Sequence, residues 1–370
     1  MTGLVGARDA AAPLPHAGPE LIGAIEMAGL RGRGGAAYPT AIKWRAVAQH
    51  SKGDAVVLVN GAEGEPHSKK DRLLMTARPH LVLDGAFLAA RVLRAKRIVL
   101  YIGERHDQAR NAMVQALGQR NEGERALVSF AAAPARYVAG AETAAIHLVN
   151  EGVATPTNVP PYPFVSGVGA APTLVHNVET LAHIAQVARG EFAGTTLITL
   201  SGAVVRQGTI EVALGTTVGD ALSWAGGARE QPRAVLVGGY FGRWFEPQAA
   251  WRLPLDHRTQ LGCGVIGVLP ESRCPVCEVT AIMRYLAAES SAQCGPCFFG
   301  LRALADACTR IAETGSNTSD VQRLHRWAAE VRGRGACKHP DGAVTFLASA
   351  LQVFAEEFGH HRSHNVRRTA

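Results

Sequence analysis

Four of the seven cysteines form two C-x-x-C pairs in the last third of the chain, and this spacing is typical of metal binding. The pairs are Cys274 with Cys277 and Cys294 with Cys297. Thiolates are soft ligands that suit zinc or iron–sulfur clusters, and in a cytosolic chain such pairs indicate metal more than disulfides. By spacing alone, the two pairs fit one structural zinc site.

A predicted helix between the two pairs argues against that zinc site. Residues 278–290 have a helical pattern, and about 13 residues at about 1.5 Å each would separate the pairs by roughly 20 Å. One zinc ion with Zn–S bonds of about 2.3 Å cannot bind both pairs unless the helix breaks. Free cysteines are also common as small buried apolar side chains. Judged by residue type alone, Cys263, Cys308, Cys274 and Cys277 are expected to be structural.

A glycine-rich segment near the N-terminus can bind an anion through its backbone. Residues 32–37 read GRGGAA and match the pattern G-x-G-x-x-A, in which glycines let backbone N–H groups approach a phosphate. Arg31, Arg33 and Lys43 surround this segment and can neutralise a phosphate. The dinucleotide pattern requires a preceding strand, whereas residues 18–30 predict a helix. A phosphate-binding loop and a flexible turn between two helices are therefore both open interpretations.

An acidic turn follows a predicted strand at residues 55–59. Residues 60–67 read NGAEGEPH, and they come at the carboxyl end of that strand, where ligands bind in open α/β sheets. The carboxylates of Glu63 and Glu65 can accept hydrogen bonds from a polar ring or a ribose, or they can belong to a solvated turn. Residues 69–72, KKDR, fit the charged first turn of a following helix.

The elements that must position these residues alternate between strand and helix patterns. Such alternation predicts a mostly parallel α/β sheet in a first domain of residues 1–190. The predicted strands are 55–59, 97–102 and 126–133, and the predicted helices are 73–94, 107–117 and one that follows residues 177–180 and ends at 189.

The pattern changes twice beyond the first domain. Residues 191–265 contain short strands at 197–200, 208–213 and 234–239 with a helix at 218–224, which predicts a small α+β domain. Beyond residue 271 no strands are expected and the patterns are those of amphipathic helices, which predicts a helical domain of residues 266–370 that carries most of the cysteines. The expected helices are 278–291, 298–313, 318–332 and 343–357.

The composition is that of an ordinary globular protein, with 47% hydrophobic and 19% charged residues. No apolar run reaches the roughly 20 residues of a membrane-spanning helix, and the N-terminus lacks the pattern of a secretory signal, so a cytoplasmic location is expected. The net charge of +7 favours acidic partners. Because the basic residues are scattered and aromatic residues make up only 6%, nucleic acid is not an expected partner.

Several motifs, in their order along the chain, resemble the flavoprotein subunit of respiratory complex I. They are RGRGGAAYPTAIK at 31–43, NGAEGEPHSKKDR at 60–72 and PTLVHNVET at 172–180. The similarity continues through YVAGAET at 137–143 and ESSAQCGPC at 289–297. Flavoproteins of hydrogenases and formate dehydrogenases are similar in the same order, and NGAEGEP also resembles an Rnf-type electron-transport subunit.

The resemblance implies three domains: a Rossmann-like α/β domain that binds FMN and NADH, a soluble-ligand-binding β-grasp domain, and a helical iron–sulfur domain. It implies an NADH dehydrogenase-like oxidoreductase that passes electrons from NAD(P)H through FMN and a [4Fe–4S] cluster. The acceptor would be a ferredoxin-like or other electron-carrier subunit, in a complex that can be membrane-associated. The implied cofactor-binding residues are Gly32, Arg33, Gly34, Gly35, Lys43, Asn60, Glu63, Glu65, Asn177 and Thr180.

The acidic turn departs from the complex I pattern at three positions. Ala62 stands for an aspartate, His67 for a glycine and Lys69 for the aromatic residue that helps to stack NADH in that family. Losing such a stacking contact costs about 0.5–1.5 kcal/mol, which weakens nicotinamide binding without abolishing it.

The cluster motif of the family, E-S-C-x-x-C-x-P-C with a distant fourth cysteine, also differs here. Ser291 replaces its first cysteine, whereas Cys294 and Cys297 match and Cys337 stands where the distant ligand is expected. Four outcomes are open: Ser291 oxygen is the fourth ligand, Cys308 replaces it, the cluster has three irons, or the cluster is absent. The same departures motivate an alternative function, a non-catalytic scaffold or assembly subunit. A more remote alternative function is that of a zinc-stabilised nucleic-acid-binding protein.

Overall fold

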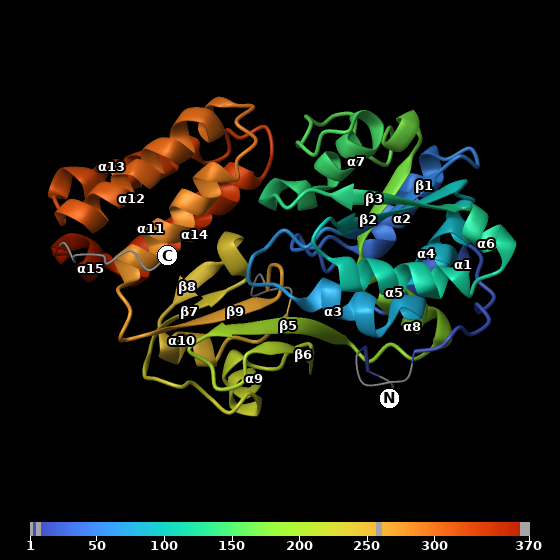
Figure 1. Ribbon diagram of the computed structural model, residues 1–370, viewed down its shortest axis with the longest axis horizontal. Coiled ribbons are helices and arrows are strands. Elements are labelled where there is room, and N and C mark those ends of the chain that lie inside the picture. Colours follow the sequence, from blue (N-terminus) through green and yellow to red (C-terminus); the bar gives the residue numbers. More distant parts are fainter. Residues whose placement is uncertain (1–2, 5–8, 257–260, 363–370) are drawn as a thin grey trace. The chain divides into compact units, whose positions relative to one another are not determined.

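The computed structural model describes residues 3–4, 9–256 and 261–362, and the chain forms two compact units (Figure 1). Within these limits, the first unit comprises residues 1–199, 208–216 and 254–264, and the second comprises residues 200–207, 217–253 and 265–370.

The first unit is built on a four-stranded parallel sheet with the strand order β3-β2-β1-β4. The predicted parallel α/β sheet is confirmed. The prediction lacked one strand, the short β4, which lies inside the motif at 172–180. The strands are β1 (Val56–Gly61), β2 (Arg97–Gly103), β3 (Val128–Ala133) and β4 (Thr173–Asn177).

Helices cover both faces of this sheet. Val57 and Val59 of β1 belong to a large core cluster with residues of α1, α2, α4, α5 and α8. Val56 and Leu58 belong to a smaller cluster with residues of α7. This alternation is the two-residue period of a strand that is buried on both sides. The helices are α1 (Glu20–Met27), α2 (Thr40–His50), α3 (Lys70–Ala77), α4 (Pro79–Leu93), α5 (Asp107–Gly118), α6 (Glu122–Ala126), α7 (Glu142–Glu151) and α8 (Val178–Arg189), with short 3₁₀ turns η1 (Tyr137–Gly140) and η2 (Val168–Ala170).

The strand order reverses between β1 and β4, and this is the point where the matched motifs lie. Successive strands run from β1 outward to β3, and the chain then returns to place β4 on the other side of β1. Asn60 and Asn177 are register partners at the carboxyl ends of these two strands. In open α/β sheets, ligands bind outside the carboxyl ends of the strands at such a reversal.

The remaining chain changes from short strands to helices, as predicted, but the strands at 243–245 and 265–270 were not predicted. Strand β7 pairs in antiparallel fashion with both β8 and β9 in the second unit. The boundary between the units crosses β5, and β6 belongs to the first unit. The elements are β5 (Thr195–Gly202), β6 (Gly208–Ala213), α9 (Val218–Trp224), β7 (Pro232–Val237), η3 (Gly239–Phe241), β8 (Arg243–Phe245), α10 (Pro247–Trp251) and β9 (Val265–Pro270).

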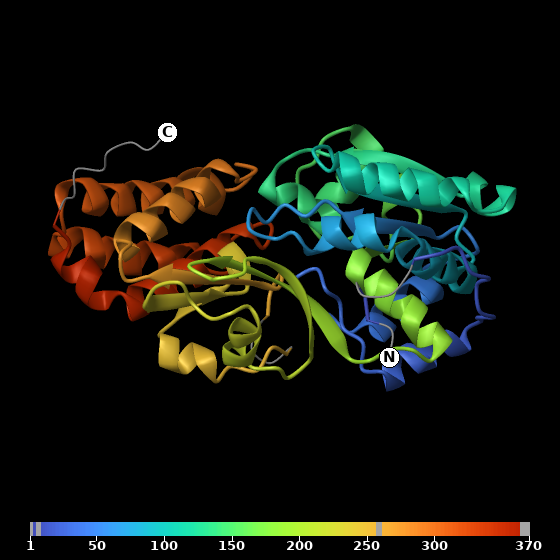
Figure 2. The ribbon, with the colours of Figure 1, turned by 60° about the horizontal axis from the view of Figure 1, so that its bottom comes forward.

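Only helices follow β9 among the residues described. Figure 2 shows them side by side in orange to red, and α11, α12, α13 and α14 contact one another in turn. They are α11 (Pro275–Ala288), a π-helical turn η4 (Pro296–Leu301), α12 (Arg302–Thr314), α13 (Thr318–Val331), α14 (His339–Val353) and α15 (Ala355–His360). Among the described residues, no helix combines the length and the apolar character needed to cross a bilayer. The division into three domains at residues 190 and 265 stays a prediction.

Helices α4 and α8 pack so closely that only glycine fits at residue 85. A Cβ atom built on Gly85 would lie 1.9 Å from the carbonyl oxygen of Leu181. We expect Gly85→Ala to lower the free energy of unfolding by about 1–3 kcal/mol through overpacking, as measured by urea denaturation. The matched control is Gly23→Ala on α1, where a Cβ atom meets nothing within 4 Å and alanine should stabilise the helix by about 0.5–1 kcal/mol. Equal shifts in the two variants would contradict the close helix packing.

Candidate functional site

The glycine-rich segment is a closed loop between α1 and α2. Its two ends meet in a bridge between Arg31 and Pro39, and the Gly32 N–H donates to the Tyr38 carbonyl oxygen at 2.9 Å. Gly35 has a φ of +103°, a conformation that favours glycine. The helix predicted before the loop is confirmed, so this is not the strand-to-helix turn of a Rossmann dinucleotide site.

The middle of the loop offers backbone donors to an anion. The N–H groups of Gly34, Gly35 and Ala36 donate to no residue that the structure describes, and all three residues are exposed. Successive free N–H groups with little side-chain bulk form a concave site that suits a phosphate. This part of the chain therefore fits the phosphate of a nucleotide cofactor.

Arg33 anchors the loop to the rest of the unit and does not face the free donors. Its backbone N–H donates to Thr180 Oγ1 at 2.9 Å, and its guanidinium donates to the Thr195 carbonyl oxygen at 3.1 Å. The same guanidinium lies 3.6 Å from Glu179 Oε1. Burial lowers the pKa of Arg33, and the carboxylate of Glu179 opposes this effect. Arg33 and Thr180, two predicted site residues, thus hold the loop in position.

A buried cluster of charged residues lies behind the loop. Lys70 Nζ contacts Asp71 Oδ1 at 2.6 Å, Glu179 Oε2 at 2.9 Å and Asn177 Oδ1 at 3.4 Å. Asn177 Nδ2 in turn donates to Asp71 Oδ2 at 2.6 Å. Although burial opposes it, the carboxylates of Asp71 and Glu179 raise the pKa of Lys70. Burial raises the pKa of Asp71 to about 6 although Lys70 opposes the shift.

Glu179 is the centre of this cluster. Its side chain has no exposed area, and its Oε1 accepts from Thr196 Oγ1 and from the Leu197 N–H, each at 2.9 Å. Burial would raise the pKa of Glu179, but Lys70, His183 and Arg33 hold it well below its ordinary value. The predicted site residues did not include Glu179, Lys70 or Asp71. The available signal was the complementary charge of two matched motifs, KKDR and NVET.

A small pocket lies beside the cluster and the loop. It measures ≈ 30 Å³, about the volume of one water molecule. A flavin does not fit inside it. The lining residues are Gly32, Arg33, Gly35, Ala37, Lys70, Glu179, Thr196, Leu197, Leu261, Gly262, Cys263 and Gly264.

Glu63 caps the helix that follows the acidic turn. Its carboxylate accepts from the N–H groups of Asp71 and Arg72 at 2.8 and 3.1 Å, and from Ser68 Oγ at 2.7 Å. It also pairs with the Arg72 guanidinium at 3.0 Å. A carboxylate at the N-terminus of α3 satisfies free backbone donors and interacts favourably with the helix dipole. All these contacts lie within the protein, so the Glu63 carboxylate holds the acidic turn and the start of α3 in place.

The other predicted residues of the turn bind the segment around η1. Asn60 Nδ2 donates to the Gly140 carbonyl oxygen at 2.9 Å, and Glu65 Oε2 accepts from the Tyr137 hydroxyl at 3.2 Å. A Cβ atom on Gly64 would lie 2.9 Å from the Tyr137 carbonyl oxygen, so glycine permits this close approach. The turn and the YVAGAET motif therefore form one unit at the sheet edge.

Lys43 reaches away from the loop towards β4 and α7. Its Nζ donates to Glu142 Oε2 at 2.7 Å and to the Val175 carbonyl oxygen at 2.9 Å. The neighbouring His176 accepts from Trp44 Nε1 through its Nε2 at 2.9 Å, which requires a neutral ring. Burial, and secondarily Lys43, lower the pKa of His176 well below its ordinary value.

Three of the four predicted cluster ligands gather in the second unit. Cys297 is buried at η4, and the thiols of Cys337 and Cys294 are near enough to raise its pKa. The neighbouring Cys297 thiol lowers the pKa of Cys337 to about 6. Ser291 is half-buried and makes no hydrogen bond with a described residue.

The rise of about 1.5 Å per helical residue excludes two other combinations of metal ligands. Cys308 is fully buried on α12, and at about 1.5 Å per residue it lies roughly 16 Å along the helix from Cys297, too far to share a cluster with it. Helix α11 separates the two C-x-x-C pairs, as predicted, and its 14 residues make it about 21 Å long. One zinc ion therefore does not bind both pairs.

The chain is thus an α/β protein with a glycine-rich loop at the switch point of its parallel sheet and a helical region that contains most of its cysteines. Three family descriptions match successive parts of this chain. Residues 25–186 match the Nuo51 FMN-binding domain, residues 197–239 the SLBB domain, and residues 278–361 the NADH-ubiquinone oxidoreductase-F iron–sulfur binding region.

Similar proteins carry one common description. The F subunit of the NADH-quinone oxidoreductase of Streptomyces coelicolor is 30% identical over 97% of this chain and 86% of its own length. The F subunit of the Escherichia coli enzyme is 30% identical over 92% of this chain and 83% of its own length. A solved NAD⁺-reducing [NiFe]-hydrogenase in the H₂-reduced state is 29% identical with a TM-score of 0.84, covering 94% of this chain; the chain spans 63% of that hydrogenase chain.

The chain belongs to the family of NADH-quinone oxidoreductase F subunits. The predicted resemblance is therefore confirmed. The predicted cofactor-binding and cluster-binding residues stay a prediction, although several of them lie together as described above.

The buried charge cluster should act as one unit in stability. Removing one partner of a buried ion pair leaves an unpaired charge, so we expect Lys70→Met or Glu179→Gln to lower the free energy of unfolding by about 3–5 kcal/mol each. The double variant should cost less than the sum, because both changes remove one shared interaction. Urea denaturation of both single variants and the double variant measures this coupling. The control is Glu26→Gln, which breaks an exposed ion pair with Arg45 and should change stability little. Single variants that behave like this control would contradict the prediction.

His176 should make stability depend on pH in mildly acidic solution. Because its folded-state pKa is well below 6.5, the unfolded chain binds a proton that the native protein does not, and stability falls as pH drops below about 6.5. The free energy of unfolding, measured by denaturation between pH 7.5 and 5, should fall less steeply with pH in His176→Gln than in the unaltered protein. The two slopes should differ by up to about 1.4 kcal/mol per pH unit. The exposed His325→Gln serves as the control and should keep the original slope. An unchanged slope in His176→Gln would rule out this linkage.

Proposed function

We propose that the chain is an electron-transfer oxidoreductase that takes electrons from NAD(P)H through FMN and a [4Fe–4S] cluster to a carrier protein. The observation that carries this proposal is the meeting of three matched motifs at one place. The glycine-rich loop, the acidic turn and the NVET motif converge at the carboxyl ends of β1 and β4, where the sheet order reverses. Membership of the F-subunit family supports the same chemistry.

The FMN phosphate would bind the free N–H groups of Gly34, Gly35 and Ala36. Arg33 and Thr180 fix the loop that carries these donors. Asn60 and Asn177 lie at the neighbouring ends of β1 and β4. Gly32 helps to close the loop through its backbone, and Lys43, Glu63 and Glu65 hold the adjoining segments in place through the contacts described above. When bound, FMN supplies the exchange between a two-electron hydride donor and single-electron acceptors. The side chains of this chain bind and orient it, and none is needed as a general base.

The nicotinamide would lie near the acidic turn. Ala62 and Lys69 remove a carboxylate and an aromatic stacking surface from the family pattern, so we expect NADH to bind more weakly than where those residues are present. NADH therefore is a substrate that this chain uses with reduced affinity.

The cluster would be held by Cys294, Cys297 and Cys337, with Ser291 as the fourth ligand. The proximity of the Cys294 and Cys337 thiols to Cys297 supports this set. Phe298 and Phe299 follow Cys297 directly and are exposed, and the Arg302 guanidinium lies 4.6 Å from the centre of the Phe298 ring. An aromatic and basic surface beside the cluster suits an acidic carrier protein.

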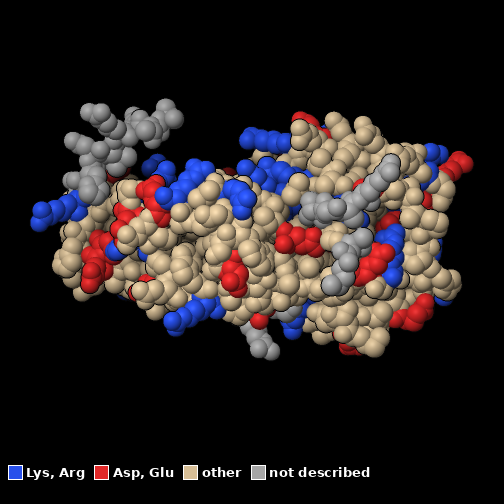
Figure 3. Space-filling view, turned by 90° about the horizontal axis from the view of Figure 1, so that it is seen from below, with Lys and Arg blue, Asp and Glu red and all other residues tan. Residues whose placement is uncertain are grey.

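We propose a ferredoxin-like or other electron-carrier subunit as the partner, within a complex that can attach the chain peripherally to a membrane from the cytoplasm. The relatives are named as subunits of NADH-quinone oxidoreductase. The net charge of +7 favours an acidic partner. In the space-filling view of Figure 3, basic and acidic groups both occur on the face drawn, with wide neutral areas between them.

The second candidate function is a non-catalytic scaffold of the same family. Ser291 and Ala62 favour it, since each departs from what a fully loaded enzyme needs. The two functions are distinguished by purifying the chain anaerobically and measuring FMN, iron and acid-labile sulfide per chain, followed by addition of NADH. Bound FMN that NADH bleaches, with about four irons per chain, supports the oxidoreductase. FMN without iron or bleaching supports the scaffold.

A negative charge in the loop should expel the FMN phosphate. We expect Gly35→Asp to raise the dissociation constant of FMN at least tenfold, a loss of about 1.4 kcal/mol, as measured by flavin fluorescence titration. The control is Gly53→Asp after α2, because Gly53 also has a positive φ and a Cβ atom there meets nothing within 4 Å. Equal FMN affinity in the two variants would show that the loop is not the phosphate site.

A further inference from the structure

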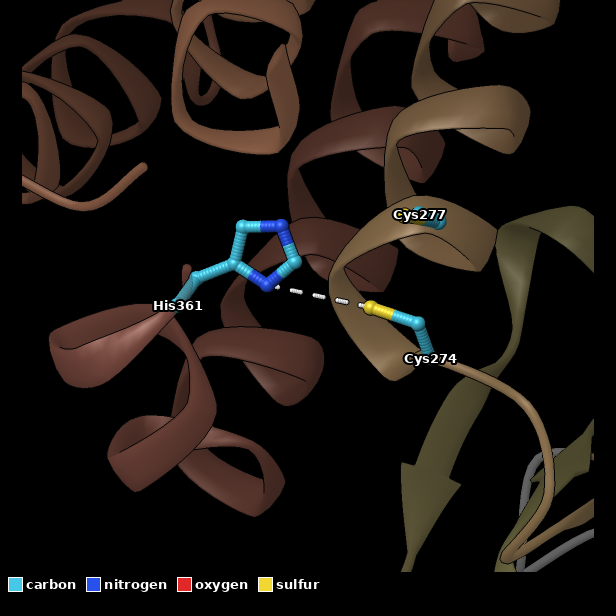
Figure 4. Close-up of side chains that lie close together, drawn as sticks. All are labelled: Cys274, Cys277 and His361. Carbon is cyan, nitrogen blue, oxygen red and sulfur yellow. Dashed lines mark hydrogen bonds between the residues drawn. The ribbon is translucent and has the colours of Figure 1, made fainter. Parts of the chain in front are cut away.

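A third group of potential metal ligands lies at the start of α11. Cys274 is the N-cap residue of this helix, and Cys277 lies in its first turn. Residues three apart on a helix share one face, so both thiols can point to the same place. His361, the residue after α15, completes the group (Figure 4). By residue type alone these two cysteines are expected to be structural, and nothing in the sequence connects them with a histidine at the far end of the chain.

The ligand atoms of the three residues lie close together. Cys274 Sγ and His361 Nδ1 are 3.8 Å apart. All three ligand atoms lie within 4.8 Å of one another. A tetrahedral zinc ion with Zn–S bonds of about 2.3 Å and a Zn–N bond of about 2.0–2.1 Å needs separations of about 3.8 Å between sulfurs and about 3.5 Å between sulfur and nitrogen. The group therefore needs to contract by at most about 1.3 Å.

The ring of His361 is held in the orientation of a metal ligand. Its Nε2 lies 3.2 Å from the Ala312 carbonyl oxygen. A carbonyl oxygen only accepts hydrogen bonds, so Nε2 carries the ring proton and Nδ1 presents its lone pair to Cys274. Metal-binding histidines commonly donate their second ring N–H to a backbone carbonyl in this way.

Two hydrogen bonds with Ser316 hold the backbone of His361 in place. The His361 N–H donates to Ser316 Oγ at 2.8 Å, and the Ser316 N–H donates to the His361 carbonyl oxygen at 2.9 Å. These bonds attach the residue to the connection between α12 and α13. A ligand fixed before the metal arrives loses little conformational entropy on binding.

We propose that Cys274, Cys277 and His361 bind one zinc ion, separate from the iron–sulfur cluster. Two sulfurs and one imidazole nitrogen form a Cys₂His set, which suits zinc better than magnesium or calcium. Binding displaces the protons of the two thiols, and a water molecule takes the fourth tetrahedral position. The ion joins the start of α11 to the chain that follows α15, so it stabilises the helical region.

The test uses the full chain, purified anaerobically with its cofactors, and measures zinc and iron separately by mass spectrometry. The variants are Cys274→Ser, Cys277→Ser and His361→Gln. The matched control is His360→Gln, which changes the exposed histidine next to the ligand. We expect about one zinc ion per chain in the unaltered protein and the control, and a loss of zinc in the three variants with iron unchanged.

Three results would overturn the proposal. They are zinc retained in all three variants, a disulfide between Cys274 and Cys277 in the anaerobic protein, and iron lost in parallel with zinc. The last result would assign these residues to the cluster. Because a variant can fail to fold, cobalt titration of the chelator-treated unaltered chain is a second measurement. Thiolate-to-cobalt charge-transfer absorption supports the site, and its absence contradicts it.

Discussion

The carboxylate of Glu179 is fully removed from solvent, and the arrangement of the whole cofactor site follows from how its charge is compensated. A buried charge is tolerated only when it is paired and hydrogen-bonded, and here the partners come from several different parts of the first unit. Lys70 comes from α3, Arg33 from the glycine-rich loop, and Thr196 and Leu197 from β5, while Glu179 itself lies in the first turn of α8. The loop cannot move far without separating Arg33 from Glu179, so one buried interaction holds the free N–H donors in a fixed place.

The parallel sheet provides the second constraint. Because β1 and β4 are neighbours in register, the turns that follow Asn60 and Asn177 leave the sheet at the same edge. The acidic turn is then fixed from within: Glu63 caps α3, and Glu65 binds Tyr137. Most polar groups of the matched motifs thus serve to hold backbone in place. The backbone in the middle of the loop keeps its N–H groups for a ligand, as an anion site requires.

Much of this architecture could be predicted from periodicity, because long buried strands and amphipathic helices leave clear patterns. Strand β4 was missed because its five residues lie inside a motif and are too short to show a period. The roles of Lys70 and Glu179 depend on tertiary contacts between segments over 100 residues apart in the chain, which a single sequence does not reveal. The same holds for Lys43, which resembles a phosphate ligand by position but pairs with Glu142. His361 approaches Cys274 only because the helices from α11 to α15 bring the chain back to the start of α11.

The central claim is that the unpartnered backbone donors of the loop bind the phosphate of FMN. Hydrogen–deuterium exchange of the peptide that covers residues 31–39, measured with and without FMN, tests this claim most directly. We expect slower exchange at Gly34, Gly35 and Ala36 when FMN is added, because their N–H groups then donate to phosphate oxygen. Unchanged exchange in a protein that has bound FMN would contradict it and would place the phosphate elsewhere.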